Sequence, residues 1–193
     1  MTRQYAKLVH FLLLAIVAIT LPTASAHAEA KYKRTVESYT IPNVVLINQD
    51  GKRVRLPELL KGDTPVVVDF IYATCTTICP VLSAGYLNLQ NKLAKSNITP
   101  RLISITIDPE NDTPRQMKEY LHRYRAKPGW EFLTGSRADI DAVMRAFDAY
   151  IPNKMSHYPL NLVRNPKDGK WLRLFGIIST SEFLAEYQSV SGK

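Results

Sequence analysis

Residues 66–80 read Val-Val-Val-Asp-Phe-Ile-Tyr-Ala-Thr-Cys-Thr-Thr-Ile-Cys-Pro, and this stretch decides the fold. Its apolar, largely β-branched first half predicts a buried strand over residues 66–72. In residues 80–93 apolar side chains then recur at helical spacing: Leu82, Tyr86, Leu89 and Leu93. Because Pro80 fits a helix only in its first turn, the helix begins within the few residues before it. Both cysteines therefore lie where a strand ends and a helix begins, which is where ligands gather in open α/β sheets.

A second strand and helix follow, with an explicit boundary between them. Residues 102–107, Leu-Ile-Ser-Ile-Thr-Ile, predict another buried strand. Thr113 stands at the N-cap of the next helix, with Pro114 in its first position and Gln116 completing a capping box. We expect the buried stripe of this helix to comprise Met117, Leu121 and Tyr124. A third helix starts after Ser136 and buries one face, formed by Ile140, Val143, Met144 and Phe147.

Shorter segments near both ends predict antiparallel strands. Residues 39–47 read as a strand, followed by an Asp-Gly turn and a short strand over residues 54–56. Residues 160–163 and 171–175 flank an Asn-Pro-Lys-Asp-Gly turn, and a last helix spans residues 181–190. Parallel strands joined by helices, with a hairpin at one edge, predict an α/β protein with a thioredoxin-like fold. We expect a central mixed sheet flanked by helices, with an N-terminal β-hairpin extension.

The N-terminal segment predicts export. Two early basic residues precede the almost wholly apolar residues 11–21, and Ala24-Ser25-Ala26 offers a small-residue cleavage site. The apolar run is well short of the ~20 residues that a membrane-spanning helix needs. We therefore predict a cleaved signal peptide over residues 1–26, with cleavage after Ala28 as the alternative. One domain over residues 35–193 would then act in the periplasm or at the outer face of the cytoplasmic membrane.

The charge distribution narrows the classes of partner. The chain carries a net charge of +8, of which Arg3 and Lys7 belong to the predicted signal peptide, leaving +6. The basic residues are scattered among acidic ones, without a dense run or an aromatic-interleaved strip, so no nucleic-acid partner is predicted. The charge is compatible with weak association with a membrane surface or an acidic partner. We expect a monomer.

Cys75 and Cys79 are the only cysteines in the chain. An exported protein works where disulfides persist. A structural disulfide across so short a loop would nevertheless contribute only ~2 kcal/mol by the chain-entropy model, a small gain for a domain of this size. The partial positive charge of the helix N-terminus favours thiolate at these positions. We therefore expect the pair either to form a reversible disulfide or to bind a soft metal ion.

The four histidines supply the remaining candidate ligands. His10 lies in the predicted signal peptide, and His122 lies off the apolar face of its helix and reads as a surface residue. His27 would chelate copper only as the mature N-terminus. His157 enters a predicted strand opposite the cysteine turn, and completes a set of two sulfurs and one nitrogen. That set suits one copper ion, as Cu(I) or Cu(II), and Met155 is a conceivable extra soft ligand.

Three features together resemble the SCO/SenC family of cytochrome c oxidase assembly proteins. They are the Cys-x-x-x-Cys-Pro run at residues 75–80, the Ile-Thr-Ile-Asp-Pro-Glu-Asn-Asp-Thr-Pro run at residues 105–114, and the single downstream His157. The resemblance covers about residues 35–190. It implies a thioredoxin-like fold that binds one copper through Cys75, Cys79 and His157. It also implies delivery of copper to the Cu-A centre of oxidase subunit II, or reduction of the cysteines of that centre.

Two other functions remain open from the residues. Ser156 stands where many members of the family carry an acidic residue, and Pro159 resembles the cis-proline that faces the cysteines in thioredoxin-type reductases. Both features favour a thiol–disulfide oxidoreductase, in which one cysteine attacks a disulfide and the other resolves the product. The run Thr-Thr-Ile-Cys-Pro is similar to a peroxiredoxin motif, in which Arg145 or Arg173 would polarise the peroxide.

Two acidic residues and one aromatic residue lie near the expected site. Asp108 and Asp112 follow the second strand, and we interpret them as part of a turn and a helix N-terminus rather than as the lining of the site. Tyr72, at the end of the first buried strand, is interpreted as a core residue, with coverage of a bound metal as the alternative.

Overall fold

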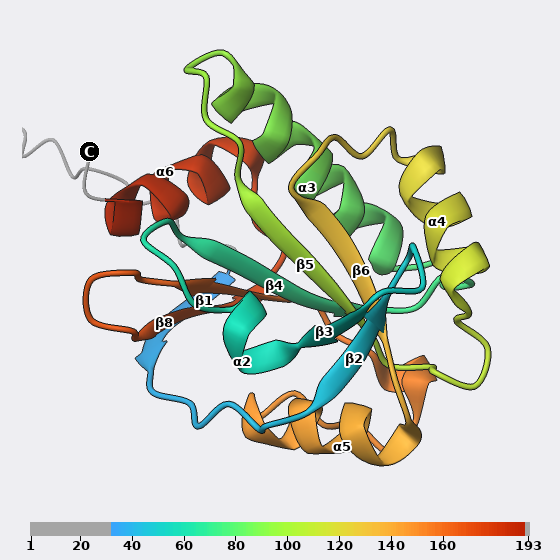
Figure 1. Ribbon diagram of the computed structural model, residues 1–193. Helices are drawn as coiled ribbons and strands as arrows, with labels where there is room; N and C mark the ends of the chain where they lie inside the picture. Colours follow the sequence, from blue (N-terminus) through green and yellow to red (C-terminus); the bar gives the residue numbers. More distant parts are fainter. Residues whose placement is uncertain (1–31, 192–193) are drawn as a thin grey trace, which may run out of the picture. The chain divides into compact units, whose positions relative to one another are not determined.

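The computed structural model describes residues 32–191. The predicted signal peptide, His10 and His27 lie outside the described residues. Along the chain, Figure 1 shows strands alternating with helices. The elements are β1 (Tyr32–Glu37), β2 (Val45–Asn48), β3 (Arg53–Arg55), α2 (Leu56–Leu59), β4 (Val66–Ile71), α3 (Cys79–Ala94), β5 (Arg101–Thr106), α4 (Pro114–Arg123), β6 (Trp130–Thr134), α5 (Arg137–Ala146), η1 (Lys154–Ser156), β7 (Leu160–Arg164), β8 (Trp171–Gly176) and α6 (Thr180–Ser191).

Within the described residues, the strands form one mixed eight-stranded sheet in the order β1-β8-β7-β4-β5-β6-β2-β3. The parallel pairs β4–β5 and β5–β6 are at its centre. The β7–β8 hairpin joins β4 antiparallel on one side, and the β2–β3 hairpin joins β6 antiparallel on the other. Figure 1 shows α3 and α6 on one face of the sheet and α5 on the other. This arrangement confirms the predicted mixed sheet, flanking helices and N-terminal hairpin.

One prediction about the strands is wrong, and two strands were missed. The expected strand over residues 39–47 is reduced to Val45–Asn48. Pro42 has no N–H to donate to a neighbouring strand, and its carbonyl accepts the Val44 N–H at 2.9 Å in a tight turn. Two strands, β1 and β6, were not predicted; β1 pairs with the distant β8, and β6 extends the parallel part of the sheet.

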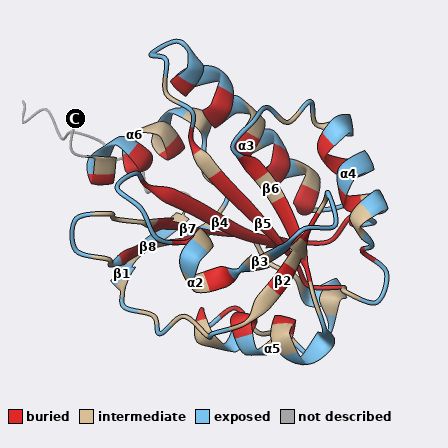
Figure 2. Ribbon diagram, in the orientation of Figure 1, coloured by how far each residue is buried: buried red, intermediate tan, exposed pale blue. Residues whose placement is uncertain are grey.

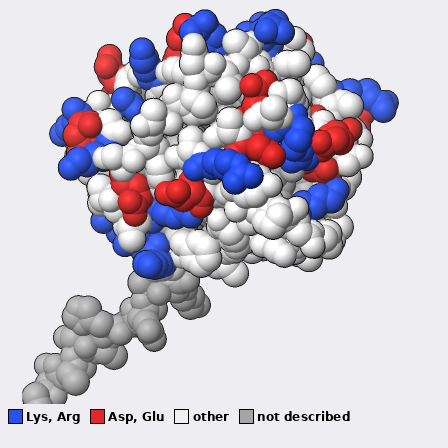
Figure 3. Space-filling model, turned by 90° about the horizontal axis from the view of Figure 1, so that it is seen from below, with Lys and Arg blue, Asp and Glu red and all other residues white. Residues whose placement is uncertain are grey.

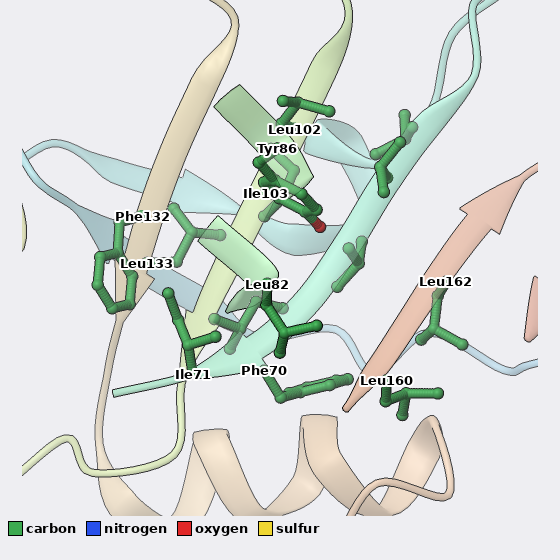
Figure 4. Close-up of a cluster of buried hydrophobic side chains, with 14 of the residues drawn as sticks. Phe70, Ile71, Leu82, Tyr86, Leu102, Ile103, Phe132, Leu133, Leu160 and Leu162 are labelled. Atoms are coloured by element: carbon green, nitrogen blue, oxygen red, sulfur yellow. The ribbon is translucent and has the colours of Figure 1, made fainter. Parts of the chain in front are cut away.

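The core lies between the sheet and the helices on each face. In Figure 2 the buried residues follow the central strands and the inner sides of the helices. Figure 4 shows Leu82 and Tyr86 of α3 among side chains of β4, β5 and β6. The four residues predicted at helical spacing, Leu82, Tyr86, Leu89 and Leu93, are all buried. Burying each such side chain contributes about 1.5–3 kcal/mol, so this stripe fixes α3, and with it the cysteines, against the sheet.

The predicted start of α4 is confirmed. Thr113 is its N-cap, Pro114 lies in the first turn, and the capping box between Thr113 and Gln116 is complete. The predicted stripe is partly wrong, because Tyr120 is buried with Met117 and Leu121 whereas Tyr124 is only half-buried. The Tyr120 hydroxyl bonds Ser83 of α3 at 2.6 Å, which holds the two helices together on the same face of the sheet.

The surface of the described domain carries both signs of charge. Figure 3 shows Lys and Arg side chains interleaved with Asp and Glu on the face that it views. Among residues 32–191, no helix combines the length and apolar character required to cross a bilayer.

Candidate metal and thiol site

The structure brings Cys75, Cys79 and His157 together. Cys75 lies in the turn after β4, Cys79 is the first residue of α3, and His157 directly follows η1. One candidate ligand atom from each residue lies within 4.8 Å of the other two. Residues separated by 78 positions thus converge at the end of β4 where the sequence placed the cysteines. The expectation that the His157 loop faces the cysteine turn is confirmed.

The N-terminus of α3 directs hydrogen bonds at one sulfur. The Cys79 backbone N–H donates to Cys75 Sγ at 3.4 Å, and the Thr77 hydroxyl lies 3.6 Å from the same atom. Burial raises the pKa of the Cys75 thiol, but hydrogen bonds from Cys79 and Thr77 outweigh it and lower that pKa to about 7. At neutral pH this sulfur is therefore partly thiolate.

The second sulfur is in a different environment. Cys79 is fully buried, and both cysteines are free thiols. Burial, followed by the interaction with the Cys75 sulfur, raises the pKa of the Cys79 thiol far above its ordinary value. The pair therefore combines one sulfur that ionises readily with one that keeps its proton until a bound cation or a reaction partner displaces it.

His157 presents its ring to the buried sulfur. Its Nδ1 lies 3.7 Å from Cys79 Sγ, whereas its Nε2 is buried without a hydrogen-bond partner. Burial lowers the pKa of His157, and the Phe70 backbone acts weakly in the opposite direction, so the imidazole is neutral at pH 7. A neutral imidazole is the form that binds metal ions. The peptide bond before Pro159 is trans, so the similarity of this proline to a reductase cis-proline does not extend to its geometry.

The loop that carries His157 is anchored to the neighbouring turns. Lys154 Nζ lies 2.6 Å from Asp108 Oδ2 and 5.4 Å from the centre of the Tyr72 ring. The Tyr72 ring also meets the His157 ring edge to face, with 6.4 Å between their centres. Tyr72 is buried, as predicted for a core residue, but it is also a wall of the site.

Asp108 and Asp112 hold the turns around the site in place. The Asp112 carboxylate accepts the Ala73 N–H at 3.2 Å from each oxygen, and it also accepts the Thr106 hydroxyl. Asp108 accepts the Asn111 side-chain amide as well as Lys154. The interpretation of both acids as turn residues is confirmed. The turn that they form is bonded to the cysteine turn at Ala73 and to the histidine loop at Lys154.

The sequence reading did not identify Asp69 as part of this region. Asp69 lies within β4, is fully buried, and neither of its carboxylate oxygens has a hydrogen-bond partner. Burial raises the pKa of Asp69 to about 8, although Ser104 opposes the shift. The signal was available, because a carboxylate inside an otherwise apolar, β-branched strand is unusual.

The alternative residues are engaged elsewhere. His122 is exposed, as predicted. The Arg145 guanidinium stacks on Tyr150, 3.5 Å from the ring centre, and Arg173 donates to the Phe147 and Asp148 carbonyls. A peroxidase would need one of these arginines beside the sulfur that attacks the peroxide, and both have other partners.

The chemistry of the three donors fits a soft metal ion. Thiolate sulfur selects Cu(I) and zinc, and imidazole nitrogen suits both. Structural zinc sites almost always have four protein ligands, whereas Cys75, Cys79 and His157 form a group of three in the described part of the chain. The same two sulfurs could instead close a disulfide, which requires Sγ atoms about 2.05 Å apart.

Residues 33–185 match the SCO1/SenC family. The chain belongs to that family. A curated SCO1/SenC relative, the SCO1 protein homolog of Bacillus subtilis (strain 168), is 41% identical over 117 residues. The alignment covers 59% of this chain and 60% of that protein, so the chain matches about three-fifths of the relative's length. The predicted membership of the SCO/SenC family is confirmed.

Solved structures of Sco proteins share the fold. BsSco, a member of the Sco family of cytochrome c oxidase assembly proteins with an identified disulfide switch, has a TM-score of 0.68 at 32% identity, covering 82% of this chain and 96% of that one. Bradyrhizobium japonicum ScoI with copper bound has a TM-score of 0.63 at 28% identity, covering 78% and 99%. A SCO1/SenC family lipoprotein from Bacillus anthracis str. Ames shares the fold, with a TM-score of 0.65 at 20% identity. The predicted thioredoxin-like fold is confirmed.

Proposed function

We propose that this protein binds one copper ion through Cys75, Cys79 and His157 and delivers it during the assembly of cytochrome c oxidase. The observation that carries the proposal is the convergence of two sulfurs and a neutral imidazole to within 4.8 Å. Membership of the SCO1/SenC family and similarity to a copper-bound Sco protein support it. Copper is cargo in this function rather than a resident cofactor.

Each of the three residues would have a separate role in copper binding. Cys75 ionises near neutral pH and would bind the ion first. Cys79 would lose its proton only when the ion replaces it, and His157 would bind through the nitrogen that faces Cys79 Sγ. Two thiolates and one imidazole suit Cu(I), and an additional oxygen ligand would accommodate Cu(II). Delivery would proceed by exchange of these ligands for those of the recipient.

The partner and the compartment follow from the same proposal. The recipient would be the Cu-A site of oxidase subunit II, or another protein that receives copper or has its thiols reduced. Residues 1–26, or 1–28 with the alternative cleavage, would direct export, and the domain over residues 35–193 would act in the periplasm or at the outer face of the cytoplasmic membrane. Weak membrane association is consistent with the net charge.

A second candidate function is thiol–disulfide exchange. The contrast between the two thiol pKa values favours it, because an attacking thiol needs a pKa near the ambient pH. In that function Cys75 would attack a substrate disulfide and Cys79 would resolve the mixed disulfide. The disulfide switch of BsSco supports this alternative.

Copper titration of the reduced protein tests the proposal. We would compare wild type, His157→Ala and, as a matched control, the exposed His122→Ala, using competition with a Cu(I) chelator and Cu(II)–thiolate absorption bands. We expect one copper per chain in wild type and His122→Ala, and roughly 100-fold weaker binding with loss of the bands in His157→Ala.

Binding that is weak and indifferent to His157 would contradict the copper proposal. The thiol function would then be measured directly, as reduction of a disulfide substrate by the reduced protein. Cys75→Ser should abolish that reduction, and His157→Ala should leave it largely intact.

A further inference from the structure

Met155 is an exposed soft ligand beside a buried site. Met155 is 74% exposed, whereas Cys75 is 7% exposed and Cys79 is fully buried. A methionine normally fills gaps in a core, and this one contributes little to packing. Thioether sulfur is a ligand that selects Cu(I), and it carries no proton that the metal must displace.

Hydrogen bonds place Met155 at the edge of the site. Its backbone N–H donates to Asn153 Oδ1 at 2.9 Å, which fixes the short η1 turn two residues before His157. Its Sδ accepts a hydrogen bond from the Tyr72 hydroxyl at 3.8 Å. The same hydroxyl interacts with the Cys75 thiol, and this interaction, after burial, contributes to raising the pKa of Tyr72 to about 12. The exposed thioether is therefore joined by a hydrogen bond to a tyrosine whose ring also contacts His157 of the site.

The positive charge beside Met155 is paired with an acidic side chain. Lys154 precedes Met155 in the chain, but its ammonium group is paired with Asp108 at 2.6 Å. Other soft donors in the described residues are unsuitable for first contact, because Met117 and Met144 are buried in the core. Met155 is thus far more accessible than either cysteine to a copper ion that arrives from solution or from another protein.

We propose that Met155 is a transient Cu(I) ligand through which copper enters and leaves the group formed by Cys75, Cys79 and His157. This proposal rests on the copper function proposed above and adds a residue to the route by which copper reaches its site. During loading, one bond from Cu(I) to its donor breaks and a bond from Met155 Sδ to Cu(I) forms, with no proton released.

Transfer inward completes the exchange. A bond from Cys75 Sγ to Cu(I) forms, any proton on that sulfur passes to solvent, and the bond from Met155 Sδ breaks. Cys79 then binds with release of its proton, and His157 binds as a neutral ligand. Copper remains Cu(I) throughout, so the sequence of steps requires no oxidant or reductant.

Loading kinetics test the proposal. Cu(I) would be presented as its complex with a coloured chelator, and transfer to reduced wild type, Met155→Leu and the buried control Met144→Leu would be followed by absorbance. We expect Met155→Leu to load about tenfold more slowly, with its equilibrium affinity within about twofold of wild type. Met144→Leu should load at the wild-type rate.

Two results of this experiment would overturn the proposal. Loading of Met155→Leu at the wild-type rate would remove any role for the thioether. An equal fall in rate and equilibrium affinity would make Met155 a permanent ligand rather than a transient one. Failure of wild type itself to bind Cu(I) would instead contradict the copper function, so the two failures are distinguishable.

A direct measurement avoids dependence on loading. In a Cys75→Ser/Cys79→Ser variant labelled at methionine methyl groups, Ag(I) would serve as a redox-inert substitute for Cu(I). We expect the Met155 methyl resonance to shift on addition of Ag(I), while those of Met117 and Met144 remain in place and report that the core is folded. An unshifted Met155 resonance in the folded variant would overturn the proposal.

Discussion

The turns after β4 and β5 occupy equivalent positions at the ends of two paired parallel strands, but differ in sequence and chemistry. Both follow a buried parallel strand, and both lead into a helix with a proline in its first turn. Helix α4 has a complete capping box between Thr113 and Gln116. Helix α3 has no side-chain cap at Ile78, and its first N–H, that of Cys79, donates to the Cys75 sulfur.

The difference shows that the N-terminus of a helix can either be capped, which stabilises the helix, or act on a reactive side chain nearby. A capping residue stabilises a helix by about 1 kcal/mol, and α3 lacks one. Its N–H group and partial positive charge act on a sulfur instead. Together with the hydrogen bonds from the Cys79 and Thr77 side chains, they outweigh the effect of burial and lower the pKa of Cys75 to about 7. The turn after β5 supports its neighbour, because Asp112 accepts the Ala73 N–H.

The largest expected effect comes from removing Cys75 Sγ, the sulfur that accepts the first N–H of α3. Cys75→Ser should weaken Cu(I) binding by roughly 1000-fold, because oxygen is a poor ligand for this soft ion. The free energy of unfolding should change by no more than about 1 kcal/mol, since one weak hydrogen bond is altered. Chelator competition and urea unfolding would measure the two quantities, with the exposed Thr76→Ala as control. Tight copper binding in Cys75→Ser would show that the ligands are elsewhere.

The strands before the two turns also differ, because the buried Asp69 of β4 lies beside a serine, Ser104, at the adjacent position of β5. The pKa of Asp69 is about 8 in the folded protein and about 4 in an unfolded chain, so between these values folding takes up a proton. This group therefore stabilises the fold fully below about pH 4, and its contribution falls as pH rises to about 8, by at most about 1.4 kcal/mol per pH unit.

Asp69→Asn should remove this pH dependence of the unfolding free energy. Urea unfolding of wild type and Asp69→Asn between about pH 4 and pH 8 would measure this effect. We expect the unfolding free energy of the variant to rise relative to that of wild type by several kcal/mol from the lower to the higher pH. Parallel pH profiles for the two proteins would mean that Asp69 is ionised in the folded state.

The bond between the two turns can be broken at Asp112. Asp112→Ala would leave the buried Ala73 N–H and Thr106 hydroxyl without their partner, which should cost about 2–3 kcal/mol of unfolding free energy. The half-buried Asp141, which pairs with Arg137 at the surface, provides a control as Asp141→Ala and should cost less than about 1 kcal/mol. Similar losses in both variants would contradict the role given to Asp112.

The capping box gives a smaller effect. Thr113→Ala should lower the unfolding free energy by about 1 kcal/mol and leave copper affinity unchanged. Ser136, which caps α5 by accepting the Asp139 N–H, offers a comparison variant, Ser136→Ala, with an expected loss of the same size. If Thr113→Ala also weakened copper binding, the two turns would be more tightly coupled than their hydrogen bonds indicate.

The smallest effect is expected at Thr77. Thr77→Val removes the hydroxyl that lies 3.6 Å from Cys75 Sγ but keeps the shape of the side chain and its backbone N–H. The pKa of Cys75 should rise by less than about one pH unit, measured by thiolate absorbance, with Thr76→Val unchanged. A larger rise would mean that the hydroxyl, rather than the helix N–H groups, controls this thiol.

The sequence predicted the site better than it predicted the edges of the sheet. The strand before Cys75, the helix after Cys79 and the capping box at Thr113 each have local signals, and all three were found. Strand β1 has charged residues at several positions and forms only because β8, far away in sequence, pairs with it. Strand β6 is short and begins after a Pro-Gly pair, so its local pattern is weak.

The site was predicted to the extent that its donors belong to distinctive residue types. Two cysteines and one histidine beside a strand could be selected from the sequence. The anchoring of the His157 loop by Lys154 and Asp108 depends on contacts between residues 46 positions apart, which no local pattern reports. Asp69 was missed because apolar periodicity identifies strands but gives no information on the hydrogen-bond partners of an acid within them.

The pairing of β1 with β8 has a consequence for the order of folding. Tyr32 lies opposite Gly176 across the ladder, and Glu186 of α6 accepts hydrogen bonds from Tyr32 and Arg34. During synthesis, the first described strand of the chain therefore has no partner until its last strand has left the ribosome. Contacts between residues so distant in sequence form slowly. The sheet thus closes at its β1 edge only after nearly the whole domain has been made, and until then the emerging chain remains incompletely folded.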